Sequence, residues 1–197
     1  MYSPLLDQLI DTLKCLPGVG PKTAQRMAFH LLQRDKPGGL RLAGSIVKAI
    51  DNIGHCEKCR TLSERAICSF CGNTARDQST MCIIESPADM MAVEQATAYK
   101  GVYFVLHGSL SPLDGIGPEE IGMDLFEQRL SENVIKDIIL ATSPTMEGET
   151  TAHYIRQIAH NFAIPISRIA HGIPMGGELE HVDGSTLSRA FAARQSI

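Results

Sequence analysis

The 197-residue sequence has no tryptophan, and only 5% of its residues are aromatic. Proteins that hold single-stranded bases by stacking place several aromatic side chains together as a platform. Tyr2, Phe29 and Phe70 are too scattered along this sequence to predict such a platform. Base stacking is therefore not indicated as a binding mode.

The sequence also lacks any apolar run long enough to cross a membrane. Asp7 and Asp11 interrupt the apolar residues near the N-terminus, unlike the uncharged core of a secretory signal peptide. The content of 44% hydrophobic and 20% charged residues is typical of a globular protein. We therefore expect a cytoplasmic protein that makes no membrane contact.

The net charge of −4 is small, and it hides an uneven distribution. Residues 1–80 contain 11 Lys or Arg and 7 Asp or Glu, whereas residues 81–197 contain 7 and 15. Between residues 12 and 49, seven basic residues accompany Asp35 as the one acidic residue. A basic N-terminal region on an acidic body predicts a localised contact with a polyanion.

A glycine-containing bend at residues 16–24 separates two segments with apolar residues at helical spacing. Pro17 ends the first segment, and the glycines permit a tight turn. The second helix then begins with backbone N–H groups that favour a phosphate, with basic side chains beside them. This helix-hairpin-helix pattern predicts DNA backbone binding without sequence readout. The predicted contact residues are Gly18, Gly20, Lys22 and Arg26.

Two alternatives apply to the same bend. An ordinary helix–turn–helix corner in a small helical bundle would show a similar apolar pattern. A nucleotide-binding P-loop would need the spacing G-x-x-x-x-G-K-[ST], which is absent, and Pro21 removes a backbone N–H that such a loop uses. The P-loop is therefore discounted, and the helical corner stays open.

Four cysteines form two C-x-x-C pairs separated by a short loop. Each pair lets two thiolates reach one ion, and two pairs complete a tetrahedron, which predicts Zn²⁺. Because four thiolates leave no open coordination position, the zinc is predicted to be structural. Disulfides or a redox site are the alternative, disfavoured in a cytoplasmic protein. The predicted ligands are Cys56, Cys59, Cys68 and Cys71; Lys58, Arg60 and Arg65 between them are a further hypothesis for DNA contact.

From Thr80 onward, strand-like and helix-like segments alternate, which predicts a mostly parallel sheet with crossover helices. Functional loops of such sheets lie at the carboxyl ends of the strands. A final helix at residues 185–194 is predicted to pack either on its own sheet or on a neighbouring subunit. The expected strands are 81–84, 102–106, a segment within 134–141, and 166–170; the expected helices begin at Pro87 and span 118–130 and 148–162.

Glutamates stand at the carboxyl ends of two predicted strands: Glu85 follows the first strand, and Glu147 and Glu149 follow the third. These two strand ends resemble the Toprim domain of topoisomerases and primases, in which carboxylates hold magnesium for phosphodiester chemistry. Ser143 and Thr145 stand where Toprim enzymes have two aspartates. Since Mg²⁺ prefers hard anionic oxygens, we predict a Toprim scaffold that does not cleave DNA. Weak Mg²⁺ binding by the three glutamates stays open, as does a plain role as helix-start carboxylates.

The order of these regions resembles the RecR family of bacterial recombination mediators over essentially the whole chain. Ser143 is one departure, since the family usually has asparagine there. The resemblance implies an α+β chain of four parts: a helix-hairpin-helix region (1–53), a zinc finger (54–74), an α/β Toprim domain (79–174) and a C-terminal segment (175–197) for oligomer contacts. The motifs that carry it are 16–22, the four cysteines, 107–118, 144–149, 171–180 and 183–190.

The resemblance further implies a non-enzymatic DNA repair factor that binds gapped, single-stranded or double-stranded DNA. It implies that RecO- and RecF-type proteins are partners in loading the RecA recombinase, and that the chain forms a ring-like homotetramer. Two other function classes stay open: a Mg²⁺-dependent nuclease or strand-passing enzyme, and an assembly hub that never touches DNA.

Overall fold

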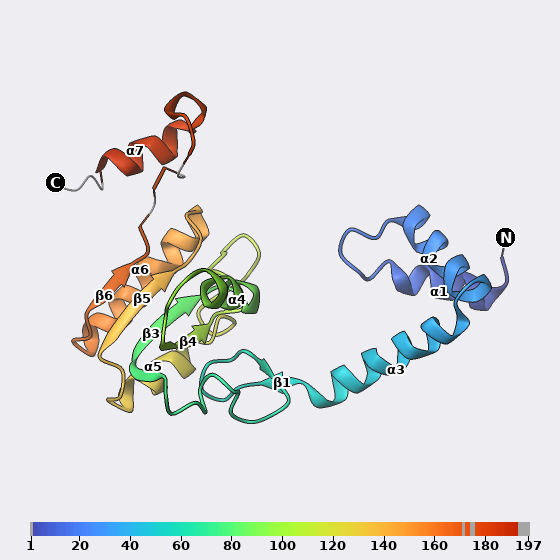
Figure 1. The fold of residues 1–197 in the computed structure, drawn as a ribbon, viewed down its shortest axis with the longest axis horizontal. Helices are drawn as coiled ribbons and strands as arrows, with labels where there is room; N and C mark the ends of the chain where they lie inside the picture. Colours follow the sequence, from blue (N-terminus) through green and yellow to red (C-terminus); the bar gives the residue numbers. More distant parts are fainter. Residues whose placement is uncertain (1, 171, 174–175, 193–197) are drawn as a thin grey trace. The chain divides into compact units, whose positions relative to one another are not determined.

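The computed structural model describes residues 2–170, 172–173 and 176–192, and the chain forms two compact units, residues 1–53 and 54–197 (Figure 1). The first unit contains three helices: α1 (Pro4–Leu13), α2 (Pro21–Gln33) and α3 (Lys36–Asn52). Proline occupies the first turn of each helix, where its missing N–H costs no hydrogen bond.

The sequence pattern does not single out α3, because Pro37 and two glycines crowd its first turn. The structure shows how this helix begins: the Asp35 side chain caps it by accepting a hydrogen bond from the Gly38 N–H at 2.8 Å. Only two of the described residues in the first unit, Ala24 and Ala28 of α2, are buried. The three helices therefore leave most of their apolar side chains exposed.

The second unit begins with a small two-stranded antiparallel sheet, β1 (Gly54–His55) and β2 (Leu62–Ser63), and continues into a four-stranded parallel sheet in the order β4-β3-β5-β6. Three helices accompany the larger sheet, followed by a short 3-10 turn and a last helix. The bounds are β3 (Asp77–Ile84), α4 (Pro87–Ala96), β4 (Gly101–Val105), α5 (Met123–Ser131), β5 (Asp137–Ala141), α6 (Met146–Asn161), β6 (Ile166–Arg168), η1 (Leu179–His181) and α7 (Gly184–Ala192).

The predicted fold class is confirmed, including the parallel sheet and the C-terminal helix. Two boundaries differ clearly. The first strand of the parallel sheet, β3, begins at Asp77 rather than at residue 81. Helix α5 begins at Met123 rather than Pro118, because Gly122 before it adopts a left-handed backbone with φ of 76°. For the helix predicted over 185–194, the residues beyond Ala192 lie outside the described part of the chain.

The core lies on both faces of the parallel sheet. On one face, Phe104 and Ile138 of the strands pack with residues of α5 and α6, among them Phe126 and Ile155. On the other face, a smaller cluster around Tyr103 packs against α4 and the cysteine-containing segment. The carboxyl ends of the strands thus meet at one edge of the sheet, where loops carry polar residues. Within the described residues, no helix has both the length and the apolar character needed to span a membrane.

Candidate nucleic-acid interface and metal centre

The bend between α1 and α2 places backbone donors and basic side chains close together in the chain. Gly18 adopts a φ of 75°, a conformation that favours glycine, and the Val19 N–H donates to the Leu16 carbonyl at 3.1 Å. Gly20 precedes the first residue of α2 in extended conformation and has no side chain with which to cap the helix. The first-turn N–H groups of α2 are therefore left to bind an external acceptor.

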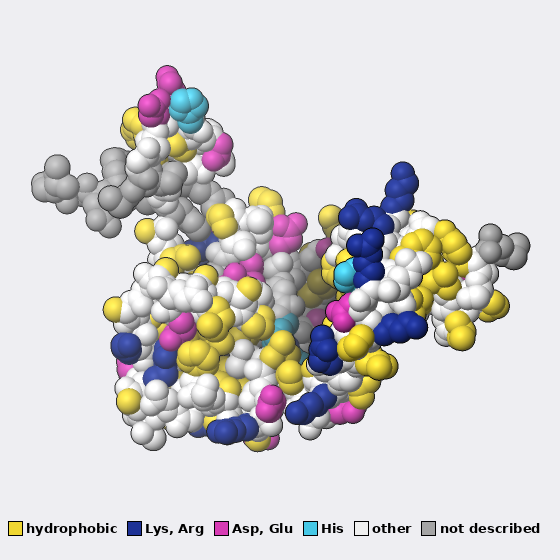
Figure 2. All heavy atoms as spheres, turned by 45° about the vertical axis from the view of Figure 1, so that its right-hand side comes forward, with side chains coloured by type: hydrophobic (Ala, Val, Ile, Leu, Met, Phe, Trp, Pro, Cys, Tyr) yellow, Lys and Arg dark blue, Asp and Glu magenta, His cyan; other side chains and the backbone are white. Residues whose placement is uncertain are grey.

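Lys22 and Arg26 lie one turn apart on α2, and both side chains are exposed. The first turn of α2 contains no acidic residue that would compete with an anion. Figure 2 shows Lys and Arg side chains gathered on one side of the N-terminal helices, with exposed hydrophobic side chains beside them. A groove of about 860 Å³ runs along α2, with Arg26 and Arg34 among apolar lining residues such as Leu13 and Met27.

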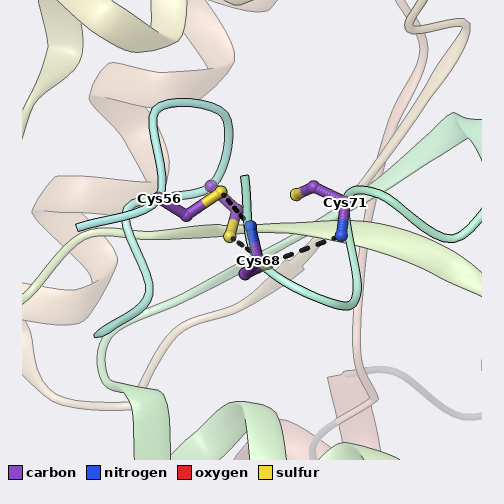
Figure 3. A group of neighbouring side chains, drawn as sticks. Cys56, Cys68 and Cys71 are labelled. Carbon is purple, nitrogen blue, oxygen red and sulfur yellow. Dashed lines mark hydrogen bonds between the residues drawn. The ribbon is translucent and has the colours of Figure 1, made fainter. Parts of the chain in front are cut away.

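The four predicted cysteines converge in a buried cluster. Their sulfur atoms all lie within 4.8 Å of one another, and the Cys59 and Cys68 sulfurs are 3.5 Å apart. The backbone N–H groups of Cys68 and Cys71 donate to the sulfurs of Cys56 and Cys68 at 3.3 and 3.4 Å (Figure 3). Such N–H···S bonds stabilise thiolates, so the cluster is consistent with a structural zinc.

A buried arginine beside the four cysteines shows whether the surroundings of the cluster suit a metal ion. Arg129 of α5 is 5% exposed, and its Nη1 atom has no hydrogen-bond partner among the described residues. A hydrogen bond with the Cys59 thiol, aided by the charge of Arg129, lowers the pKa of Cys71 to about 6. Zn²⁺ bound by four thiolates would carry a net charge of −2, and the single positive charge of the guanidinium would offset half of it. The donor set and its surroundings therefore fit zinc.

The cysteine segment is fastened to the edge strand of the sheet. The Val105 N–H of β4 donates to the Cys59 carbonyl at 2.9 Å. The Arg60 guanidinium donates to the carbonyls of Leu106 and Glu120, each at 3.2 Å, and to that of Ile121. Arg60 is thus a docking residue, which corrects the hypothesis that it contacts DNA. Lys58 and Arg65 are exposed.

The Toprim-like edge shows why its carboxylates do not act together. The Glu85 carboxylate accepts hydrogen bonds from the Ser143 backbone N–H, at 3.0 Å, and from the Ser143 hydroxyl. Glu149 forms an ion pair of 2.5 Å with Arg168, while Glu147 is exposed. Across the described residues, these three carboxylates do not form a group whose oxygens lie within 4.8 Å of one another.

Thr145 has a structural role at this edge, since its side chain caps α6 by accepting from the Gly148 N–H at 3.1 Å. Sequence reasoning missed Arg168 and Arg129. The one signal for Arg168 was its place within the predicted strand 166–170, one of the strands of the predicted parallel sheet. Arg129 carried no signal, because its approach to the cysteines depends on tertiary packing.

A helical hairpin, a buried four-cysteine cluster and a four-stranded parallel sheet with crossover helices together define a zinc-finger protein of the Toprim class. Family models for the RecR helix-hairpin-helix, the RecR four-cysteine zinc finger domain, the Toprim domain and the RecR C-terminal region match residues 6–50, 53–73, 79–170 and 172–195. Recombination protein RecR of Saccharophagus degradans is 55% identical over 197 residues, which is the full length of both chains. The chain belongs to the RecR family, and is thus a DNA repair and recombination mediator rather than an enzyme.

Proposed function

We propose that the chain binds DNA through the phosphate backbone, and that the bend between α1 and α2 makes the contact. The observation that carries this proposal is the start of α2, where an uncapped helix N-terminus is flanked by exposed Lys22 and Arg26. Donors of this kind bind phosphate oxygens whatever the base sequence, so the binding is non-specific. Gly18 and Gly20 keep the approach free of side chains.

The first unit also supports self-association into a homotetrameric ring. Three helices with only two buried residues among those described cannot form a stable core of their own. The apolar side chains of α3 are exposed: Leu40 by 77% and Ile50 by 74% of their surface. Burying these side chains against a second copy would stabilise both units. The C-terminal segment, residues 175–197, provides the second contact needed to close a ring.

Membership in the RecR family supports the partners proposed for this activity. The chain works in the cytoplasm with RecO- and RecF-type proteins on gapped DNA, and helps to load RecA where single-strand-binding protein covers the strand. A basic DNA contact on an overall acidic chain suits this role, because the acidic surface stays available for protein partners. Strand cleavage is not part of the proposal, since Glu85 and Glu149 bond to Ser143 and Arg168.

The test compares two double variants of the zinc-loaded chain. Lys22→Ala with Arg26→Ala removes the proposed phosphate ligands, and Arg41→Ala with Lys48→Ala removes the same charge from exposed positions on α3. Affinity is measured by fluorescence anisotropy on gapped duplexes of two unrelated sequences. We expect the first variant to lose roughly tenfold per side chain on both sequences, the effect of one charge-assisted hydrogen bond.

The control variant is expected to change affinity only slightly, with the same slight change on both duplexes. Equal losses for the two variants would contradict the assignment to the bend. No binding by the wild-type chain at low salt would favour the hub that acts without DNA contact. The mass of the wild-type chain in solution, measured without DNA, tests the tetramer separately.

A further inference from the structure

Side chains with nitrogen donors recur at every fourth position of α2, the spacing of neighbours on a helix surface. They are Lys22, Arg26, His30 and Arg34, and all four are exposed. Arg34 directly follows the last residue of α2 and keeps a right-handed helical backbone. Because four helical residues rise by about 6 Å, α2 presents a row of donors at that regular interval.

The last three residues of this row line one groove, the groove of about 860 Å³ along α2. The described residues that line it include no aspartate or glutamate. Asp35 follows Arg34 in the sequence, but its carboxylate caps α3 by accepting from the Gly38 N–H at 2.8 Å. Neither Arg26 nor Arg34 forms an ion pair with any other described residue. The groove therefore attracts anions along its length.

The rest of the groove lining is mostly apolar and open to water. Leu16, Met27 and Leu42, which come from the bend, α2 and α3, are exposed by 47%, 38% and 48%. Phe29 is the one aromatic side chain among the described lining residues, and its ring packs edge to face on Tyr2. A ligand with flat apolar groups would gain free energy by covering these aliphatic side chains.

The chemistry of the groove selects among polyanions. A single strand of DNA carries phosphates at a regular interval and leaves the faces of its bases uncovered, so it offers both kinds of contact at once. A duplex offers phosphates in the same way, but pairing and stacking hide its base faces. The apolar lining therefore favours an unpaired strand over a paired one.

We propose that this groove holds a single strand of DNA. Successive phosphates bind Arg26, His30 and Arg34, and the base faces lie against the aliphatic side chains of the lining. The groove site rests on the phosphate contact proposed at the bend, because Arg26 belongs to both, and it adds the class of substrate: the unpaired stretch of gapped DNA. Arg34 belongs to the groove alone, since it lies at the opposite end of α2 from the bend.

Binding to paired and unpaired probes tests the proposal. The probes are a fluorescein-labelled oligothymidylate of about 12 nucleotides, within the range of single-strand sites, and a blunt duplex of the same length. Fluorescence anisotropy compares the zinc-loaded wild-type chain with Arg34→Ala and with Arg41→Ala, an exposed arginine of α3 outside the groove lining. We expect Arg34→Ala to lose roughly tenfold in affinity for the single strand, and roughly twofold or less for the duplex.

The control Arg41→Ala is expected to change both affinities only slightly. On the single strand, the salt dependence of binding should become shallower by about 0.7 in Arg34→Ala, the value for one phosphate contact. Arg34→Lys keeps the charge and should bind within roughly threefold of the wild type. Met27→Gln makes the lining more polar and should weaken single-strand binding alone, by roughly threefold.

Each variant is first checked for a cooperative thermal transition and for its mass in solution, and Lys22→Ala reports separately on the bend. If Lys22→Ala weakens binding to both probes while Arg34→Ala binds the single strand as the wild type does, the groove proposal is overturned and the bend contact stands. If Lys22→Ala changes neither affinity, the bend contact is contradicted instead. Equal losses of Arg34→Ala on both probes overturn the preference for a single strand. A change in the solution mass of Arg34→Ala without loss of single-strand affinity also overturns the proposal, because a second copy of the chain then covers the groove.

Discussion

Arg60 is expected to be the side chain that fastens the zinc finger to the Toprim sheet. Its guanidinium donates to three carbonyls, those of Leu106, Glu120 and Ile121, and lies 5.9 Å from the centre of the Phe104 ring. Burial lowers the pKa of this guanidinium, so its hydrogen bonds offset a real desolvation cost. Arg60→Met keeps the apolar stem and removes only the guanidinium.

The loss of stability expected for Arg60→Met can be worked out from these contacts. A hydrogen bond from a charged donor contributes about 1.5–3 kcal/mol, and the cation–π contact adds about 0.5–1 kcal/mol. The contact with Glu120 is exposed, so water replaces it at little cost. The contributions are not additive, and we expect Arg60→Met to lower the free energy of unfolding by roughly 3 kcal/mol.

Urea denaturation of the zinc-loaded chain, followed by circular dichroism, measures this change. Arg65→Met is the matched control, because Arg65 belongs to the same finger and its side chain is exposed. We expect the control to stay within about 0.5 kcal/mol of the wild type. Trypsin is also expected to cut the finger faster in Arg60→Met than in the control. If Arg60→Met unfolds at the same urea concentration as Arg65→Met, the docking role of Arg60 is refuted.

Three further predictions concern residues of the second unit, with one control position in α3 of the first unit. Hydrogen bonds from Arg76 lower the pKa of Glu94 in the folded chain. The pair therefore stabilises the fold fully above the unfolded-state pKa of Glu94, and this stabilisation is lost as the pH falls through the lowered pKa. Arg76→Met should flatten the acid side of a plot of melting temperature against pH. Gly148→Ala should destabilise the fold by about 1–3 kcal/mol, because the added Cβ would meet the carbonyl oxygen of Ser143. Gly44→Ala in α3, which has open space around it, should stabilise the fold by about 0.5–1 kcal/mol. Thermal melts of both variants measure the change in stability. Arg129→Met should release zinc to a chromogenic chelator faster than the wild type, and equal release rates would contradict charge compensation by Arg129.

Features carried by neighbouring residues were predictable from the sequence. The two C-x-x-C pairs predict by spacing alone that four thiols converge, and the structure confirms that the four sulfurs lie together in a buried cluster. The bend at Gly18 follows from the conformational freedom of glycine, and the alternation after Thr80 gives the parallel sheet. Local steric and spacing rules decide each of these features, so no tertiary information was needed.

Features that depend on contacts between distant residues were not predictable. The helix predicted from Pro118 begins five residues later, because Gly122 turns the chain with a left-handed backbone. Gly122 also leaves room for the side chain of Arg60, which is 62 positions away in the sequence. A Cβ atom on Gly122 would lie 2.2 Å from the Arg60 guanidinium. The sequence could suggest that Glu85 and Glu149 share an edge. It could not show that Arg168 would supply the cation there, because the order of the strands decides that contact.

The salt dependence of DNA affinity measures directly whether α2 holds the phosphate backbone, because phosphate contacts release counterions on binding. The logarithm of the association constant, plotted against the logarithm of salt concentration, falls with a slope of about −0.9 for each phosphate neutralised on a duplex. We expect the replacement of Lys22 and Arg26 by alanine to make this slope shallower by roughly 2, equally on unrelated sequences. An unchanged slope in that variant, with the wild-type chain bound to the same duplexes, would contradict the claim that α2 holds the DNA backbone.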